Sequence, residues 1–170
     1  MPPCANFLPY NQGLSERPTM LPVKLIVCPT DFSEPARACV RKAGELAEHF
    51  DAELLLLNVV PVLPSLPPDP NYVFKIPEYE RYLHTDAEEH LKKTREELVA
   101  KNVRVRTMVG HGSPADEIVL IAKKENADLI TISTHGSTGI ERLVFGSVAE
   151  KVVRLAECPV LTVRQKKGAA

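Results

Sequence analysis

Two polar segments that follow apolar runs carry the residues with the best chance of doing chemistry. The first is Pro29-Thr30-Asp31, directly after VKLIVC; the second spans residues 133–147 and leads into a helical pattern. Five of the eight glycines lie between positions 110 and 146. Glycine permits close backbone approach, and the N–H groups at a helix start favour an anion. The second segment therefore predicts a phosphate site, although turns and helix caps also need glycine.

The sequence offers no convincing catalytic set. It contains neither the GxxxxGK[ST] loop, whose lysine neutralises phosphates, nor a GxGxxG turn after the first apolar run. Four histidines show no partner at metal-ligand spacing and receive no catalytic role: His49, His84, His90 and His111. We predict no catalytic residue and no protein metal site.

Composition narrows the class of protein. The 170 residues are 44% hydrophobic, which is enough for one core. A net charge of −1 with interspersed signs argues against nucleic acid as a partner. Four cysteines without a CxxC pair indicate reduced thiols. The sequence shows neither a membrane-spanning segment nor an export signal. A cytoplasmic protein is therefore expected. We divide the chain into a poorly ordered leader (1–20), one domain (21–165) and a tail (166–170).

Apolar runs and helical stripes alternate along the domain. Strands are predicted near residues 23–28, 53–60, 103–109, 127–134 and 159–164, and the alternating third run suggests a sheet edge. Helices are predicted after Ser33, over residues 79–101, after Ser113 and from a cap at Ser147. The proline-rich stretch of residues 61–78 is expected to be a loop. This order predicts an α/β fold: an open, mainly parallel five-stranded sheet with helices on both faces, Rossmann-like and doubly wound. In such sheets ligands bind beyond the carboxyl ends of the strands.

Three segments resemble the universal stress protein family: VKLIVCPTDFSEPA, ELLLLNVV, and ADLITISTHGSTGIERLVFGSVAEKVVRLAECPVLTVR. The resemblance runs from about residue 23 to residue 164. Its nucleotide-binding members carry glycine, two residues, glycine, nine residues, then glycine with serine or threonine. Gly136, Gly146 and Ser147 match this pattern, whereas Ser133 replaces the first glycine.

The resemblance implies an adenine-nucleotide site. It places Pro29 and Asp31 near the adenine and ribose, and backbone groups around Leu54 at the adenine edge. Asp31 would accept a hydrogen bond from a ribose hydroxyl, but a turn or helix-cap role remains open for it. His135 is equally consistent with filling a loop and with touching ligand. The full set of expected ligand-binding residues is Pro29, Asp31, Leu54, Ser133, His135, Gly136, Gly139, Gly146, Ser147 and Val148.

The expected function is a stress-response or signalling module that binds ATP, or AMP or ADP, with Mg²⁺ or Mn²⁺ possible and at most slow hydrolysis. A dimeric interaction protein that has lost nucleotide binding is the alternative, and a true phosphotransferase or ATPase is a third class. Residues 160–163 form a β-prone run that would leave an open apolar edge in a monomer. Members of the family that the chain resembles commonly dimerise through this strand, so a homodimer is expected. An edge strand covered within its own chain is the alternative.

Overall fold

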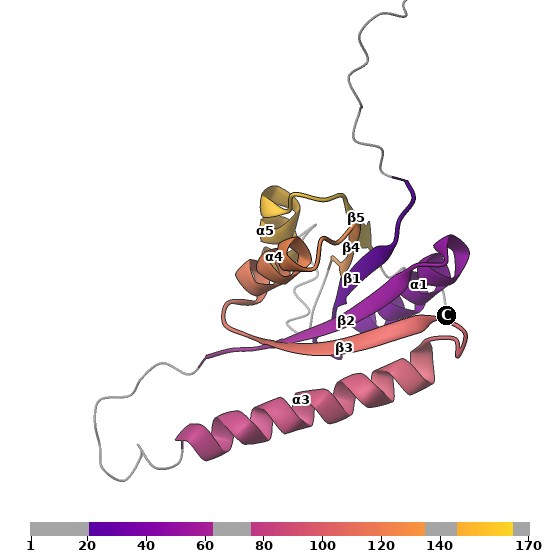
Figure 1. Ribbon diagram of the computed structural model, residues 1–170. Helices are drawn as coiled ribbons and strands as arrows, with labels where there is room; N and C mark the ends of the chain where they lie inside the picture. The colour runs from indigo at the N-terminus through magenta and orange to yellow at the C-terminus, as the bar shows by residue number, and fades with distance from the viewer. Residues whose placement is uncertain (1–20, 63–75, 135–145, 165–170) are drawn as a thin grey trace, which may run out of the picture.

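The computed structural model describes residues 21–62, 76–134 and 146–164 (Figure 1). The predicted leader and tail, and most of the proline-rich loop, lie outside these ranges. The strands are β1 (Leu25–Pro29), β2 (Glu53–Val60), β3 (Arg104–His111), β4 (Leu129–Ser133) and β5 (Val160–Val163). The helices are α1 (Glu34–Phe50), α3 (Ile76–Leu98), α4 (Pro114–Lys124) and α5 (Ser147–Leu155).

The five strands form one sheet in the order β3-β2-β1-β4-β5, and every strand pair is parallel. This confirms the predicted doubly wound α/β fold. The alternating strand β3 lies at an edge, as expected, and the strongly apolar β2 lies inside the sheet. The first three strands of the chain lie side by side from β1 outward to β3. The chain then crosses back, and β4 pairs with the other side of β1. The strand order thus reverses at β1 and β4, where a ligand crevice is expected.

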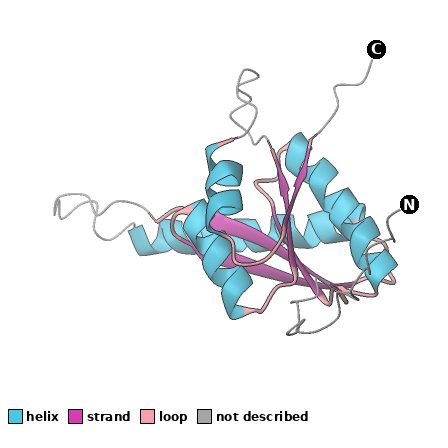
Figure 2. Ribbon diagram, turned by 90° about the horizontal axis from the view of Figure 1, so that it is seen from above, coloured by secondary structure: helices cyan, strands magenta, loops and turns pink. Residues whose placement is uncertain are grey.

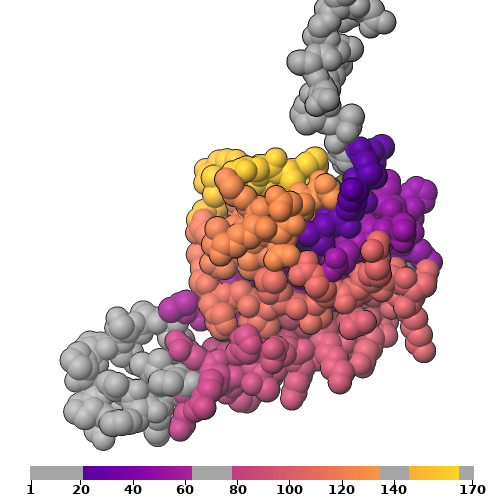
Figure 3. Space-filling view, viewed as in Figure 1, coloured from indigo at the N-terminus to yellow at the C-terminus, as the bar shows by residue number. Residues whose placement is uncertain are grey.

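Each face of the sheet is covered by its own pair of helices (Figure 2). Successive side chains of a strand point to opposite faces. In β2, Leu54 and Leu56 therefore join the core under α1 and α3, while Leu55 and Leu57 join the core under α4 and α5. The space-filling view shows α3 along one side of the molecule, with α4 and α5 at another (Figure 3). Burial on both faces explains why β2 is almost continuously apolar.

The helix starts follow local chemistry. Ser33 precedes α1, and its hydroxyl accepts a hydrogen bond from the backbone N–H of Ala36 at 3.4 Å. Ser113 is the N-cap residue of α4, which has proline in its first turn. The expectation that Ser147 caps the last helix was wrong. Gly146 has the extended cap conformation, with φ −70° and ψ 151°, and Ser147 is the first residue of α5.

The helix before β3 runs over Ile76–Leu98 instead of residues 79–101. Its buried stripe includes Ala87, Leu91 and Thr94, in agreement with the predicted pattern. Among the residues that the structure describes, no helix combines the length and apolar character needed to cross a membrane.

Candidate ligand-binding site

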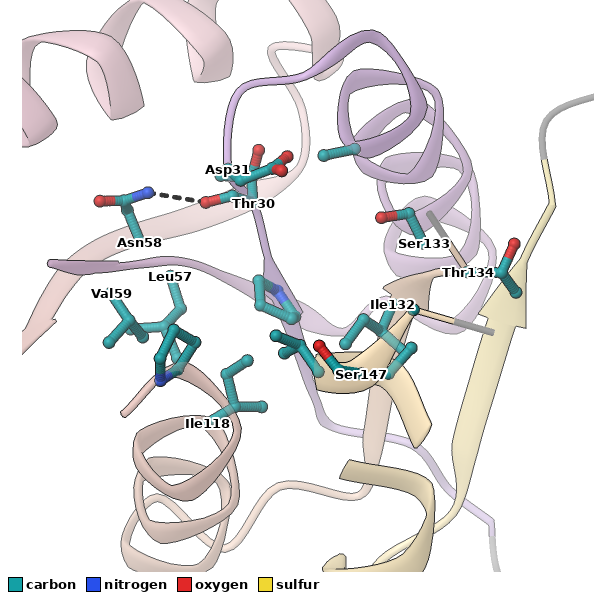
Figure 4. A pocket seen from close by; sticks show the side chains of 16 residues that line it. Thr30, Asp31, Leu57, Asn58, Val59, Ile118, Ile132, Ser133, Thr134 and Ser147 are labelled. Atoms are coloured by element: carbon teal, nitrogen blue, oxygen red, sulfur yellow. Dashed lines mark hydrogen bonds between the residues drawn. The ribbon is translucent and has the colours of Figure 1, made fainter. Parts of the chain in front are cut away.

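A pocket of about 310 Å³ opens at the carboxyl ends of β1, β2 and β4 (Figure 4). Its position coincides with the reversal of strand order. The strands and the turns after them contribute Pro29, Thr30, Asp31, Leu57, Asn58, Val59, Ile132, Ser133 and Thr134. The starts of the helices contribute Ala36, Pro114, Ile118, Gly146, Ser147, Val148 and Ala149. The volume lies at the lower end of the usual range for small-molecule sites.

Much of the pocket wall is apolar. Leu57 and Ile132 come from the strands, and Ile118 faces them from α4 (Figure 4). Pro29, Pro114 and Val148 add further apolar surface. A pocket with apolar walls and a few polar groups suits a flat ring whose edge carries hydrogen-bonding atoms.

The turn after β1 is fixed by hydrogen bonds. The N–H of Thr30 donates to the carbonyl oxygen of Leu57 at 2.8 Å, and the side-chain amide of Asn58 donates to the carbonyl oxygen of Thr30 at 2.7 Å (Figure 4). Phe32 has a φ of 63°, which is uncommon for a residue other than glycine. Its N–H donates to the Thr30 hydroxyl oxygen at 3.0 Å. These contacts hold Asp31 at the rim of the pocket.

Asp31 takes part in the turn itself. Its Oδ1 accepts hydrogen bonds from the Ser33 N–H at 3.1 Å and from the Ser33 hydroxyl at 2.5 Å. Asp31 therefore has the structural role in the turn that the sequence left open for it. A carboxylate has about four acceptor positions, so a role in the turn and a hydrogen bond to a ligand are compatible. Asp31 is also the one ionisable side chain among the described residues of the pocket wall.

Three helices begin at the pocket: α1 contributes Ala36, α4 Pro114 and α5 Ser147. Neither N-cap residue, Ser113 of α4 or Gly146 of α5, caps its helix with a side-chain hydrogen bond. Helix starts carry partial positive charge, so their convergence makes this end of the sheet favourable for an anion.

Gly146 packs closely against the chain that follows β4. Its N–H donates to the carbonyl oxygen of Thr134 at 2.7 Å, and an added Cβ would lie 3.3 Å from that oxygen. Its φ of −70° suits any residue. Close packing, and not the backbone angle, therefore favours glycine here.

An ion pair joins the first turn of α4 to the second turn of α5. The Lys151 ammonium lies 2.7 Å from the Asp116 carboxylate. Hydrogen bonds from Lys151 and from Ser113 hold the pKa of the Asp116 carboxyl below its usual value. The pair is solvent-exposed, so its effect on stability is small.

The structure brings together six of the ten predicted ligand-binding residues: Pro29, Asp31, Ser133, Gly146, Ser147 and Val148. His135, Gly136 and Gly139 lie outside the described residues. Leu54 does not reach the pocket, because it is the second residue of β2, fully buried and paired with Ile26. Leu57, Asn58 and Val59 occupy the end of β2 that faces the pocket.

Ten pocket residues are absent from the predicted ligand-binding set. Thr30 and Thr134 lie in the two polar segments that the sequence had singled out. The others were not expected: Ala36, Leu57, Asn58, Val59, Pro114, Ile118, Ile132 and Ala149. Asn58 could have been predicted, because a polar residue near the carboxyl end of an apolar strand is a candidate for the ligand site. The contribution of α4 had no comparable signal, since it depends on how that helix packs over β2.

The decisive comparison is with protein families. The universal stress protein family model matches residues 22–164. The chain belongs to the universal stress protein family. A universal stress protein of Methanocaldococcus jannaschii is 39% identical over 146 residues, which cover 85% of this chain and 84% of the relative.

Solved structures of universal stress proteins share this fold. Another M. jannaschii member is 28% identical, with a TM-score of 0.71 over 86% of this chain and 99% of the other. A universal stress protein from Lactobacillus plantarum is 25% identical, with a TM-score of 0.73 over 84% of this chain and 98% of the other.

More distant structural neighbours carry ligands. They include a universal stress protein in complex with cAMP (23% identical, TM-score 0.56), an Arabidopsis thaliana member with AMP bound (20%, 0.55) and an Archaeoglobus fulgidus member in complex with dAMP (20%, 0.52). Each covers 82–85% of this chain and at least 92% of its own. At these identities the similarity concerns the fold.

Proposed function

We propose that this universal stress protein binds an adenine nucleotide in the pocket and acts as a stress-response or signalling module in the cytoplasm. The observation that carries the proposal is the arrangement of Asp31 and the start of α5 at separate sides of one apolar pocket (Figure 4). A nucleotide needs an apolar surface for its base, an acceptor for its ribose and positive potential for its phosphates. The pocket offers these three environments.

The base fits the apolar wall formed by residues such as Leu57, Ile118 and Ile132. The ribose hydroxyls fit Asp31, whose turn is fixed from β2 by Asn58. The phosphates fit the start of α5, where Gly146 lies so close to the Thr134 carbonyl oxygen that an added Cβ would crowd that oxygen. The neighbours with cAMP, AMP and dAMP support the proposal because they indicate that this fold can hold adenine nucleotides.

ATP is the proposed ligand, with AMP and ADP as its closest competitors and a Mg²⁺ or Mn²⁺ ion on the phosphates. Such ions bind chiefly through phosphate oxygens and few protein groups. We propose at most slow hydrolysis. General acid–base catalysis and phosphoryl transfer need a positioned base and charge-neutralising groups, and the described pocket wall supplies Asp31 as its one ionisable group.

The proposal includes a homodimer formed through β5. This strand pairs with β4 on one side and ends the sheet on the other. Leu161 of β5 is 41% exposed, which places a large apolar side chain on that margin. An edge strand of β-branched and apolar residues is a natural template for pairing with a second copy.

A second candidate function rests on Ser133. This residue lines the pocket and stands where the nucleotide-binding pattern has glycine. Its Cβ and hydroxyl take up space near the proposed phosphate end. In this alternative the protein has lost nucleotide binding and works as a dimeric interaction protein.

Isothermal titration separates the two functions. The purified protein, freed of copurified nucleotide, is titrated with ATP and AMP, with and without Mg²⁺. Saturable binding supports the nucleotide function, whereas absence of binding to both ligands favours the dimeric interaction protein.

The variant Asp31→Asn tests the placement of the ribose. The asparagine oxygen can still accept the Ser33 N–H, so the turn is preserved, but the charged acceptor is lost. We expect the affinity for ATP to fall about tenfold, since hydrogen bonds to charged groups are worth roughly 1.5–3 kcal/mol. Asp51→Asn, at the far end of α1, is the matched control and leaves affinity unchanged. Equal affinities of Asp31→Asn and the unaltered protein would refute this placement.

A further inference from the structure

Two histidines that are 27 positions apart in sequence meet beside the sheet. His84 belongs to α3, and His111 is the last residue of the edge strand β3. The Nδ1 of His84 lies 3.0 Å from the Nε2 of His111, with ring centroids 5.1 Å apart and planes 9° apart. The two rings thus contact each other, although their spacing in the sequence is not that of metal ligands. Sequence spacing could not reveal this contact, because the fold brings α3 alongside β3 (Figure 1).

The distance between the two nitrogens is close to that of ligands sharing one metal ion. Two nitrogens bound to Zn²⁺ at 2.0–2.1 Å in tetrahedral geometry lie about 3.3 Å apart. Adjacent positions of a square-planar ion at a similar bond length lie about 2.9 Å apart. The observed 3.0 Å falls between these values, so the spacing of the two nitrogens matches that of ligands on a common ion.

The surroundings of His84 suit a metal ligand. Its other ring nitrogen, Nε2, lies 3.4 Å from the Glu88 carboxylate one helical turn later. Metal-binding histidines commonly donate their second ring N–H to such a carboxylate, which fixes the ring and makes the ligating nitrogen more basic. The His84 side chain is 39% exposed, so a hydrated ion has access to it.

We propose that His84 and His111 form a binding site for a divalent transition-metal ion, with Zn²⁺, Ni²⁺ and Cu²⁺ as the candidates. Imidazole nitrogen suits these metals better than Mg²⁺ or Ca²⁺. Water completes the coordination, because no group of three or more metal-ligating side chains occurs in the described parts of the chain. The ion links α3 to β3.

This site is separate from the nucleotide pocket, since none of His84, Glu88 and His111 lines that pocket. It is also distinct from a Mg²⁺ or Mn²⁺ ion held by nucleotide phosphates. The two proposals can therefore fail independently.

The test is a Zn²⁺ titration of the full-length protein, without a polyhistidine tag, treated with chelator and free of nucleotide. Isothermal titration is expected to show saturable binding of one ion, and NMR of the imidazole nitrogens is expected to shift both His84 and His111. His84→Asn retains a short polar group on the helix but removes the imidazole. His84→Asn and His111→Asn are each expected to weaken Zn²⁺ binding by about tenfold or more.

His90→Asn is the matched control. His90 lies on the same helix and also faces a carboxylate, with its Nδ1 3.3 Å from Asp86, but its ring packs against Phe32 and not against a second histidine. We expect the His90→Asn variant to bind Zn²⁺ with the affinity of the unaltered protein. Circular dichroism verifies that each variant is folded. Absence of saturable binding, or equal affinities for His84→Asn and the unaltered protein, overturns the proposal and leaves the pair as a hydrogen-bonded contact.

Discussion

Asn58 shows how a single side chain can hold the pocket in shape. It lies half-buried near the end of β2, and its amide donates to the carbonyl oxygen of Thr30 at 2.7 Å. That carbonyl belongs to the turn that presents Asp31. Asn58 therefore acts as a positioning residue for the turn, because it connects two neighbouring strand ends beyond their last ladder bonds.

The nearly isosteric variant Asn58→Asp tests this role. It replaces the donor by a carboxylate and sets two oxygens against each other, so the free energy of unfolding is expected to fall by about 1–3 kcal/mol. Urea denaturation followed by circular dichroism measures the change. Asn102→Asp is the control, since Asn102 donates to Glu48 at an exposed position and its replacement is expected to change stability by less than about 0.5 kcal/mol. Equal losses in the two variants would contradict a special role for Asn58.

At the scale of elements, Asp128 joins the beginnings of two strands. Its Oδ2 accepts hydrogen bonds from the N–H groups of Lys24 at 2.7 Å and Leu25 at 3.0 Å, and its own N–H donates to the carbonyl oxygen of Leu25. The side chain thus fixes where β4 begins against β1. This pairing lies at the reversal of strand order, on which the position of the pocket depends.

We expect Asp128→Ala to lower the free energy of unfolding by about 1–3 kcal/mol, because two backbone N–H groups lose a charged acceptor. The measurement is again urea denaturation. Asp86→Ala is the control. It removes a partly exposed carboxylate of α3 that contacts His90, so we expect a smaller fall in the free energy of unfolding. A stability of Asp128→Ala equal to that of the unaltered protein would show that the strand pairing is fixed without this side chain.

The elements themselves could be predicted from the sequence to a large extent. Continuous apolar runs such as ELLLLNVV identify buried parallel strands, and the buried stripe of α1 follows the helical period. The start of α5 was predicted one residue late, because serine is the more common cap and the close contact of Gly146 with Thr134 is a tertiary feature.

The site could be predicted only in part. The turn at Asp31 and the start of α5 follow from the rule that ligands bind at the carboxyl ends of parallel strands. The same rule favours Asn58, near the carboxyl end of β2, over Leu54, which lies at the amino end of that strand. The contributions of Pro114 and Ile118, and the meeting of His84 with His111, depend on which helix covers which strand. No local pattern encodes that choice.

At the scale of the whole molecule, the sheet has two edges of different character. On β3, Arg106 forms ion pairs with Glu53 and Glu125, and hydrogen bonds to Glu125 and then Glu53 raise its pKa. This edge therefore carries charges, which discourage pairing with another chain. The opposite edge, β5, presents Leu161 instead. The asymmetry favours β5 as the strand that pairs in the proposed homodimer.

Leu161→Lys tests that dimer. In a twofold-symmetric dimer both copies carry the substitution, so two added lysines would lie close together at the paired strands. Like charges opposed across paired strands are destabilising. We expect size-exclusion chromatography with light scattering at micromolar protein to give a dimer mass for the unaltered chain and a monomer mass for Leu161→Lys. Leu120→Lys is the control, because Leu120 of α4 is equally exposed, at 41%, but lies away from the edge strand. A dimer that survives Leu161→Lys and dissociates in Leu120→Lys would move the interface to α4, whereas a monomeric unaltered protein would remove the dimer from the proposed function.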